Sequence, residues 1–219
     1  MSSIRVKSLL FAQFARVSKA LASGNRLELL EFLAQGERSV DALAKLSDLT
    51  VANTSRHLQV LRHAGLVEAR KEGPFVYYKV SGDGVVRLLA ALQEVAQHNV
   101  AEVQRIVDTY LTSKDSMEPV SMDQLARRIA QGLVTVLDVR PREEYEAGHL
   151  PGAINVPLAE LDEQAQRMPR DREVIAYCRG PFCVLSFEAV ARLRAKGYTA
   201  KRLDTGFPEW KLAGLPVES

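Results

Sequence analysis

The hydrophobic pattern of the first third of the chain predicts helices. Apolar side chains recur every three or four positions through residues 4–21, which places them on one face of a helix. The same period returns in residues 26–34 and ends near Gly36, a residue type common just beyond a helix. Two amphipathic helices are therefore expected at the start of the chain.

Polar residues mark the start of the next two helices. Ser39 is expected to cap a helix over residues 40–46, and Thr50 to cap a helix that runs to His63 and closes at Gly65. Two short helices joined by a tight turn, the second rich in small polar and basic side chains, indicate a helix-turn-helix.

Two β-rich segments follow this pair. Residues 66–70 and 76–80 flank Lys71-Glu72-Gly73-Pro74, which is strong hairpin punctuation. A basic hairpin after a helix-turn-helix is the pattern of a winged helix. Residues 83–111 then read as one long helix, whose apolar stripe is too long for a small domain to cover. The stripe consists of Leu88, Leu92, Val95, Val100, Val103, Ile106, Val107 and Tyr110.

The pattern changes after residue 111. Small polar residues and Pro119 make residues 112–119 a predicted linker. The chain of 219 residues exceeds the usual size of a single core, so we expect one domain over residues 1–111 and a second over residues 120–219.

Strands and helices alternate in the second domain. The buried strands are expected at residues 133–139, 174–177 and 200–203. The helices are expected at residues 121–130, 158–166 and 184–196. This alternation predicts a parallel α/β sheet, in which ligands bind beyond the carboxyl ends of the strands.

Composition narrows the class of protein. The hydrophobic content of 47% supplies real cores, but no apolar run approaches the roughly 20 residues of a membrane span. Arg5, Lys7, Arg16 and Lys19 interrupt the segment where a signal peptide would be apolar. We therefore expect a soluble cytoplasmic protein without a membrane partner.

Charge is spread unevenly along the chain. Through Ser113 there are 14 Lys and Arg residues against 11 Asp and Glu residues, whereas the remainder has 15 against 16. The first domain is thus mildly basic, which is compatible with binding nucleic acid and does not by itself argue for it.

The stretch TSRHLQVLRHAGLVEARKEGPFVYYKV closely resembles the ArsR/SmtB family of dimeric winged-helix repressors, and the resemblance covers residues 1–111. It implies that the protein binds double-stranded DNA as a homodimer. The first and last helices would form the dimer interface, and a twofold dimer implies a pseudo-palindromic operator with half-sites about one helical turn apart.

The resemblance divides the helix after Thr50 into a core face and a DNA face. The residues expected in the core are Val51, Leu58, Leu61 and Leu66. The residues expected to face DNA are Asn53, Thr54, Ser55, Arg56, His57 and Gln59. Arg56 is the best single candidate for a DNA contact, and Arg70 and Lys71 in the wing would contact phosphate or the minor groove. The alternative for Arg56 and Lys71 is a solvated surface charge.

Metal sensing is not expected from this domain. Members of the resembled family sense metals through cysteines near the recognition helix or through acidic and histidine ligands on the last helix. Residues 39–45 contain no cysteine, and His98 and Asp108 are not a recognisable ligand pair. His57 and His63 also lack a nearby cysteine. We predict no metal site and no cofactor.

Three separated motifs in the second half resemble the rhodanese (sulfurtransferase) family, in that family's order. They are LDVRPREEYEAGHLPGAINVP, YCRGPFCVLS and GFPEW followed by AGLPV. The resemblance covers roughly the last hundred residues and implies a rhodanese-like parallel sheet. The full expectation is a two-domain chain, with a mainly α winged helix-turn-helix followed by an α/β rhodanese-like domain.

All the thiol chemistry lies in the second motif, because Cys178 and Cys183 are the two cysteines of the chain. By resemblance, Cys178 is the catalytic residue. It is predicted at a strand end just before a helix, where backbone amides, the helix terminus and the adjacent Arg179 would favour a thiolate. This thiolate would attack the outer sulfur of a sulfane-sulfur donor such as thiosulfate or polysulfide and become a persulfide.

Other residues complete the candidate site. By resemblance Asp138 orders the active-site loop, and Arg140 and Arg142 attract anionic donors. The alternative for Arg142 is a surface salt bridge with Glu144 or Glu146. His149 is expected to be structural.

Cys183 has two interpretations. It is either a resolving thiol that attacks a persulfide on Cys178, or a buried, inert cysteine that packs the loop.

Three details bear on the reaction. A cysteine phosphatase needs an arginine six residues after its nucleophile, and Val184 stands there, so phosphatase activity is disfavoured. Pro181 lacks an N–H group, and Thr205 stands where rhodaneses commonly have glycine, so we expect turnover to be less efficient than in rhodaneses.

Three hypotheses follow from the sequence. The first is a DNA-binding repressor whose rhodanese-like domain senses reactive sulfur through Cys178. The second is an active sulfurtransferase with a separate DNA-binding activity. The third, ranked lowest, is a sensor of arsenite, since trivalent arsenic prefers three thiolates and one chain offers two.

Overall fold

A computed structural model describes residues 3–219 of the chain. Its contacts divide the chain into two compact units, Met1–Ala91 and Leu92–Ser219. The predicted division at residues 112–119 stays a prediction, since the change between units lies within one helix, α5 (Asp83–Asn99). We describe each unit by itself.

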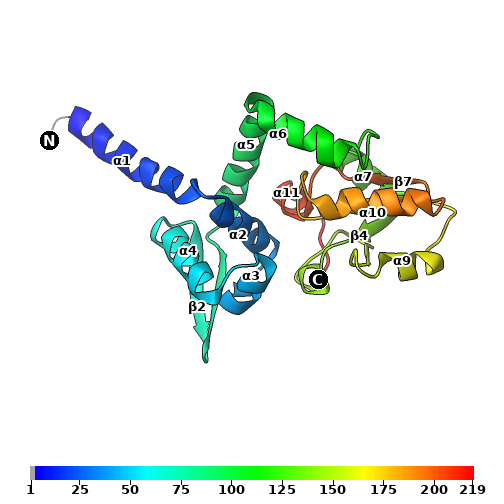
Figure 1. Ribbon diagram of the computed structural model, residues 1–219, viewed down its shortest axis with the longest axis horizontal. Helices are drawn as coiled ribbons and strands as arrows, with labels where there is room; N and C mark the ends of the chain where they lie inside the picture. The colour runs from blue at the N-terminus through cyan, green and yellow to red at the C-terminus, as the bar shows by residue number, and fades with distance from the viewer. Residues whose placement is uncertain (1–2) are drawn as a thin grey trace. The chain divides into compact units, whose positions relative to one another are not determined.

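The first unit is a winged helix-turn-helix (Figure 1). Its helices are α1 (Ser3–Leu21), α2 (Gly24–Gln35), α3 (Val40–Leu46) and α4 (Val51–His63), followed by the first part of α5. Its strands are β1 (Arg38–Ser39), β2 (Val67–Glu72) and β3 (Phe75–Val80). They form an antiparallel sheet in the order β1-β3-β2, and β2 and β3 are the wing.

The predicted caps of the helix-turn-helix are confirmed. The Ser39 hydroxyl accepts a hydrogen bond from the Ala42 N–H at 3.2 Å, and the Thr50 hydroxyl accepts one from the Asn53 N–H at 3.3 Å. Gly65, with φ of 76°, ends the turn after α4 in the left-handed region that glycine adopts without strain.

One face of α4 is buried in the core of this unit. Leu58 and Leu61 are completely buried and Leu66 nearly so, as predicted. The prediction for Val51 is wrong, because this first residue of the helix is 49% exposed. Thr54 takes the buried position instead, one turn before Leu58.

The long helix predicted over residues 83–111 is interrupted at Val100. There the backbone is extended, with φ of −111° and ψ of 100°, and it separates α5 from α6 (Ala101–Ile106) and the π-helical turn η1 (Val107–Thr112). The Asn99 side-chain amide donates to the Val95 carbonyl, one turn earlier in α5, at 2.9 Å.

The second unit contains a four-stranded parallel sheet. Its strands are β4 (Val134–Asp138), β5 (Ile154–Asn155), β6 (Glu173–Tyr177) and β7 (Ala200–Arg202), in the order β5-β4-β6-β7. Its helices after η1 are α7 (Met122–Ala130), α8 (Arg142–Glu146), α9 (Leu161–Gln164), α10 (Val184–Ala195) and α11 (Phe207–Leu212), with a 3-10 turn η2 (Ala165–Arg167) after α9. The three predicted strands are confirmed, while β5, α8 and α11 had not been predicted.

Alternate residues of the central strands pack into two hydrophobic cores, one on each face of the sheet. On one face, Leu137 of β4 and Ala176 of β6 pack with apolar residues of α9 and α10, and Cys178 belongs to the same cluster. On the other face, Val136 and Ile175 pack with residues of α7 and α11. Successive side chains of a strand point to opposite faces of the sheet, and this alternation places Cys178 on the α10 side.

The segment predicted as a linker is anchored to the second unit. The Asp115 side chain is 1% exposed, and its carboxylate contacts Arg194 at 2.7 Å and Arg202 at 3.3 Å. Lys114 pairs with Glu188 at 2.6 Å. Since Glu188 and Arg194 lie on α10, the chain just after η1 is tied to the helix that begins at the cysteine loop.

Candidate functional site

The two cysteines lie at the two ends of a tight loop between β6 and α10. Cys178 directly follows the carboxyl end of β6, and Cys183 is the residue that precedes the first turn of α10. Both are buried, Cys178 at 1% and Cys183 at 9% exposed, and their sulfur atoms are joined in a disulfide. The loop therefore brings the two thiols within bonding distance of each other.

The helix terminus belongs to Cys183 rather than to Cys178. Cys183 has the extended backbone of an N-cap residue, and its carbonyl accepts hydrogen bonds from the N–H and hydroxyl of Ser186. We had expected Cys178 immediately before a helix, but five residues of loop separate it from Val184. The positive end of the α10 helix dipole therefore lies next to Cys183, the N-cap residue.

Arg179 is turned toward a carboxylate. Its Nε donates to both Glu144 oxygens at 3.0 and 3.1 Å, and a terminal nitrogen donates at 2.8 Å. Glu144 is completely buried and the Arg179 side chain is 13% exposed. Arg179 was expected to add a positive charge beside Cys178, and in the structure this charge is paired with a buried carboxylate.

The backbone of the loop is braced from the segment before α11. A Cβ atom on Gly206 would lie 2.3 Å from the Arg179 carbonyl carbon and 2.4 Å from the Gly180 nitrogen. The Phe207 N–H donates to the Cys178 carbonyl at 3.2 Å. Only a residue without a side chain allows this approach, so Gly206 fixes where the peptide after Arg179 lies.

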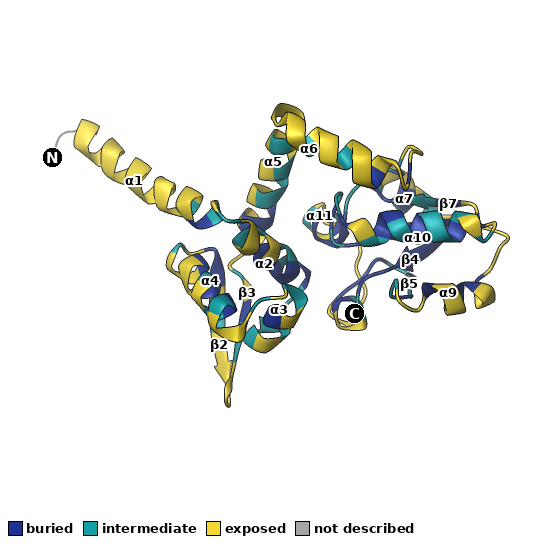
Figure 2. Ribbon diagram, in the orientation of Figure 1, coloured by how far each residue is buried: buried dark blue, intermediate teal, exposed yellow. Residues whose placement is uncertain are grey.

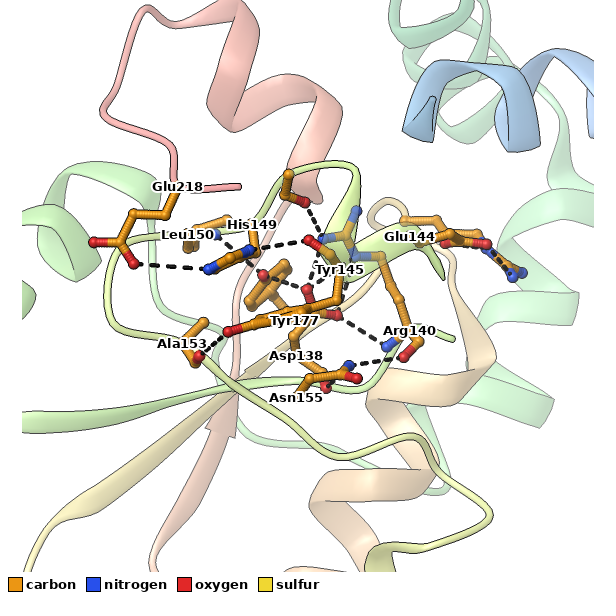
Figure 3. Close-up of polar contacts among 12 residues, drawn as sticks. Asp138, Arg140, Glu144, Tyr145, His149, Leu150, Ala153, Asn155, Tyr177 and Glu218 are labelled. Atoms are coloured by element: carbon orange, nitrogen blue, oxygen red, sulfur yellow. Dashed lines mark hydrogen bonds and ion pairs between the residues drawn. The ribbon is translucent and has the colours of Figure 1, made fainter. Parts of the chain in front are cut away.

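Asp138 is the centre of a buried polar network beside this loop (Figure 3). Its carboxylate accepts hydrogen bonds from the Arg140 backbone N–H and guanidinium and from the Tyr177 hydroxyl. The Leu150 N–H donates to the Tyr177 hydroxyl, and Asn155 donates to the carbonyls of Asp138 and Arg140. Asp138 thereby holds the loop after β4 and, through Tyr177, the strand end that carries Cys178.

The network fixes the protonation states of its members. Burial disfavours the charged form of Arg140, but the hydrogen bonds that Arg140 donates to Asp138, together with the Asp138 charge, raise its pKa above the ordinary value. Burial, and next the Asp138 charge, raises the pKa of Tyr177 well above its ordinary range. Arg140 therefore stays a cation and Tyr177 a neutral donor at any physiological pH.

The two arginines that follow β4 differ in their exposure. Arg140 is completely buried, with its guanidinium 4.4 Å from the centre of the Phe207 ring, so it cannot attract a donor from solution. The Arg142 side chain is 63% exposed and lies 3.9 Å from Glu160. The salt bridge expected with Glu144 or Glu146 is replaced by this loose contact.

His149 and Trp210 lie in structural positions. The His149 ring stacks on Tyr145 with centroids 3.7 Å apart, and its Nε2 lies 3.7 Å from Glu218 (Figure 3). Trp210 is 1% exposed and donates its indole N–H to the Pro216 carbonyl. Both contacts hold the end of the chain near the loop that follows α8.

The exposed face of α4 carries part of the predicted DNA-binding set. Arg56 and Gln59 are exposed, and Asn53, Ser55 and His57 are half-buried. Thr54 contradicts its prediction, because it is completely buried and its hydroxyl donates to the Thr50 carbonyl at 3.1 Å. A small polar residue is tolerated there because this hydrogen bond satisfies it.

His57 lies on this face in its neutral form. Partial burial, with the charges of Arg26 and Arg56 adding to it, lowers the pKa of His57 below its ordinary value. At pH 7 it can donate and accept hydrogen bonds but adds no positive charge.

The two cations of the wing differ: Arg70 is paired with carboxylates, whereas Lys71 is exposed. Arg70 donates to Glu37 at 2.7 Å and to Glu72 at 2.5 Å, and lies over the Tyr77 ring. Lys71 is exposed, and none of the ion pairs in the part of the chain that the structure describes involves it. Lys71 is thus better placed than Arg70 to meet a phosphate.

The described residues contain neither a metal-binding cluster nor a membrane-spanning helix. Among residues 3–219, no cluster of three or more His, Cys, Asp or Glu side chains is arranged to hold a metal ion. No helix in the same range is both long and apolar enough to cross a membrane.

Sequence reasoning missed Glu144 and Gly206 as parts of the site. Glu144 had been considered only as a partner for Arg142, and Gly206 only as the first residue of the GFPEW motif. Their position inside the family-like motifs was the available signal, but the partners of each lie 26 or more residues away in the chain.

Comparisons with known proteins agree with this architecture. Residues 23–69 match the family "Bacterial regulatory protein, arsR family", and residues 121–213 match "Rhodanese-like domain". The HTH-type transcriptional regulator Rv0324 of Mycobacterium tuberculosis is 47% identical over 212 residues, which are 97% of this chain and 93% of that protein.

Two further similarities cover one half of the chain each. The human thiosulfate:glutathione sulfurtransferase is 33% identical over 42% of this chain and 90% of its own length. A solved homodimeric winged helix-turn-helix DNA-binding domain from Mycobacterium bovis is 46% identical, covers 46% of this chain and 91% of its own, and has a TM-score of 0.43. The chain belongs to the HTH-type transcriptional regulators, and it joins an arsR-family DNA-binding region to a rhodanese-like domain.

Proposed function

We propose that this regulator is a homodimeric repressor that senses reactive sulfur through Cys178 and releases its operator when the two cysteines of the loop are oxidised. The observation that carries the proposal is the disulfide between Cys178 and Cys183 within the rhodanese-like unit. The DNA-binding unit contains no cysteine, so a thiol signal has to enter through this loop.

The proposed reaction has two steps. The Cys178 thiolate attacks the outer sulfur of a sulfane-sulfur donor, whose sulfur–sulfur bond breaks, and Cys178 becomes a persulfide. The Cys183 thiolate then attacks the Cys178 Sγ and expels the added sulfur as hydrosulfide, leaving a disulfide. The thiol pair is oxidised by two electrons, and the sulfane sulfur is reduced. This sequence assigns Cys183 the resolving role.

Dimerisation would use the apolar side chains that the first unit leaves exposed. Figure 2 shows α1 as exposed along most of its length, although it is strongly apolar. Phe11 and Phe14 are each 59% exposed on α1, and Leu88 of α5 is 38% exposed. Apolar helix faces of this size are typical of surfaces that pair with a second copy.

The proposal is tested by operator binding with and without polysulfide. We expect the wild type to lose two hydrogen atoms by intact mass and to release a promoter fragment. Cys178→Ser should show no change in mass and should remain bound to the promoter fragment. Cys183→Ser should retain one added sulfur, because the persulfide cannot be resolved. A wild type that forms the disulfide and binds DNA unchanged would refute the switch.

A second candidate is catalytic sulfur transfer. It is favoured by the similarity to a human thiosulfate:glutathione sulfurtransferase, which covers 42% of this chain and 90% of that protein. In this case Cys178 would pass its sulfur to an external thiol or cyanide before Cys183 reacts. Multiple turnovers per chain in a cyanide or glutathione assay, retained in Cys183→Ser, would support it. A single sulfur loaded per chain would argue against it.

A further inference from the structure

The charges around the cysteine loop bear on which sulfur donor it accepts. Thiosulfate carries two negative charges and approaches a thiolate, so it needs cations or several free amide donors at the site. A persulfide or polysulfide delivers the same outer sulfur with less charge. The two donor classes therefore require different surroundings for Cys178.

Arg179, the residue that follows Cys178 in the chain, has its charge already engaged. Arg179 makes three contacts of 3.1 Å or less with the carboxylate of Glu144, which is completely buried. If the guanidinium turned toward a dianion, the buried Glu144 carboxylate would lose these three hydrogen bonds. Breaking a buried pair in this way is strongly unfavourable. The pair therefore holds Arg179 away from any donor.

The other arginines near the site offer no replacement. Arg140 is completely buried and bound by Asp138, and the Arg142 side chain extends 63% exposed toward Glu160. Within the loop, Pro181 lacks an N–H group. Gly206 and Phe207 hold the loop backbone from the other side, at the peptide after Arg179 and at the Cys178 carbonyl.

We propose that the site discriminates against thiosulfate and takes its sulfur from hydropersulfides and polysulfides, with the buried Glu144–Arg179 pair as the specificity determinant. This inference rests on the proposed reaction at Cys178. In its first step the Cys178 thiolate attacks the outer sulfur of a hydropersulfide RSSH. The donor S–S bond breaks, RS⁻ leaves, and Cys178 gains one sulfur together with the donor's proton.

The test compares two donors on three proteins in the Cys183→Ser background, where added sulfur stays on Cys178. The donors are glutathione persulfide and thiosulfate, and loading is followed by intact mass. The proteins are the parent, Glu144→Gln, and Arg127→Gln as the control. Arg127 is an exposed arginine on α7, a helix that packs on the sheet face opposite Cys178.

We expect the parent to load from persulfide and to react with thiosulfate no faster than free glutathione does. Glu144→Gln releases the Arg179 charge and should raise the thiosulfate rate about tenfold or more, the effect of one charge-assisted contact. Arg127→Gln should change neither rate. A parent in which thiosulfate outcompetes persulfide would overturn the inference while leaving the sensing proposal intact.

Two outcomes separate the inference from the proposed function. If neither donor loads Cys178, the proposed function itself fails. If Glu144→Gln does not fold, sulfate competition on the parent decides instead. We expect sulfate not to slow persulfide loading relative to chloride at equal ionic strength, and inhibition specific to sulfate would reveal a dianion site and contradict the inference.

Discussion

Gly206→Ala is predicted to disable sulfur loading at Cys178 while leaving the rest of the chain folded. The backbone of Gly206 is extended, with φ of −121° and ψ of −173°, so alanine can adopt its conformation. The whole effect is therefore steric. The added methyl group would lie 2.3 Å from the Arg179 carbonyl carbon and 2.4 Å from the Gly180 nitrogen.

The size of the effect follows from these distances. An ordinary contact begins near 3.4 Å, so the peptide after Arg179 must move by about 1 Å, and both atoms are backbone. A displacement of about 1 Å between reacting groups lowers rates about 100-fold. The strain should also lower the free energy of unfolding by about 1–3 kcal/mol.

The assay is single-turnover loading of Cys178 from glutathione persulfide, followed by intact mass in the Cys183→Ser background. Gly84→Ala is the matched control, because a Cβ on Gly84 meets nothing within 4 Å. Gly84→Ala should load at the parent rate. Loading of Gly206→Ala within threefold of the parent, with an unchanged unfolding midpoint, would refute the argument that Gly206 sets the loop.

Three other predictions concern binding and stability. Arg56→Ala should weaken operator binding by about 1–3 kcal/mol, whereas Lys71→Ala should reduce the slope of log affinity against log salt by about 0.9, both measured by fluorescence anisotropy. Asp115→Asn should lower the free energy of unfolding of the second unit in urea by about 3–5 kcal/mol, because it leaves buried arginine charge uncompensated. Lys114→Gln, at the exposed pair, should lower the same free energy by about 1 kcal/mol or less. Tyr177→Phe should cost about 1–3 kcal/mol by the same measurement, since it removes a buried hydrogen bond to Asp138. Equal unfolding midpoints for the Asp115 and Lys114 variants, or a salt slope unchanged by Lys71→Ala, would contradict these assignments.

Local signals in the sequence predicted the elements that local chemistry controls. Ser39 and Thr50 cap helices because their hydroxyls reach N–H groups only three residues away. The Leu133–Val139 strand was predicted nearly to its ends, because a buried parallel strand is a continuous apolar run. The break at Val100 was missed, since the apolar period continues across it and carries no glycine or proline.

The partners of individual side chains could not be predicted in this way. Thr54 was assigned to the DNA face because it is polar, but its hydroxyl is satisfied within the helix and its small size fits the core. Arg179 was expected to act on Cys178, yet its charge is taken by Glu144, 35 residues earlier in the chain. Such pairings depend on how the strands bring loops together, which residue spacing does not encode.

The most direct test of the account is operator affinity measured with the same protein in its dithiol and disulfide forms. The disulfide form is made with polysulfide, verified by the loss of two hydrogen atoms, and reversed with dithiothreitol. We predict that affinity falls about tenfold or more on oxidation, a typical coupling between two sites, and returns on reduction. Cys178→Ser should not respond. Equal affinity of the verified dithiol and disulfide forms would contradict the claim that this loop controls DNA binding.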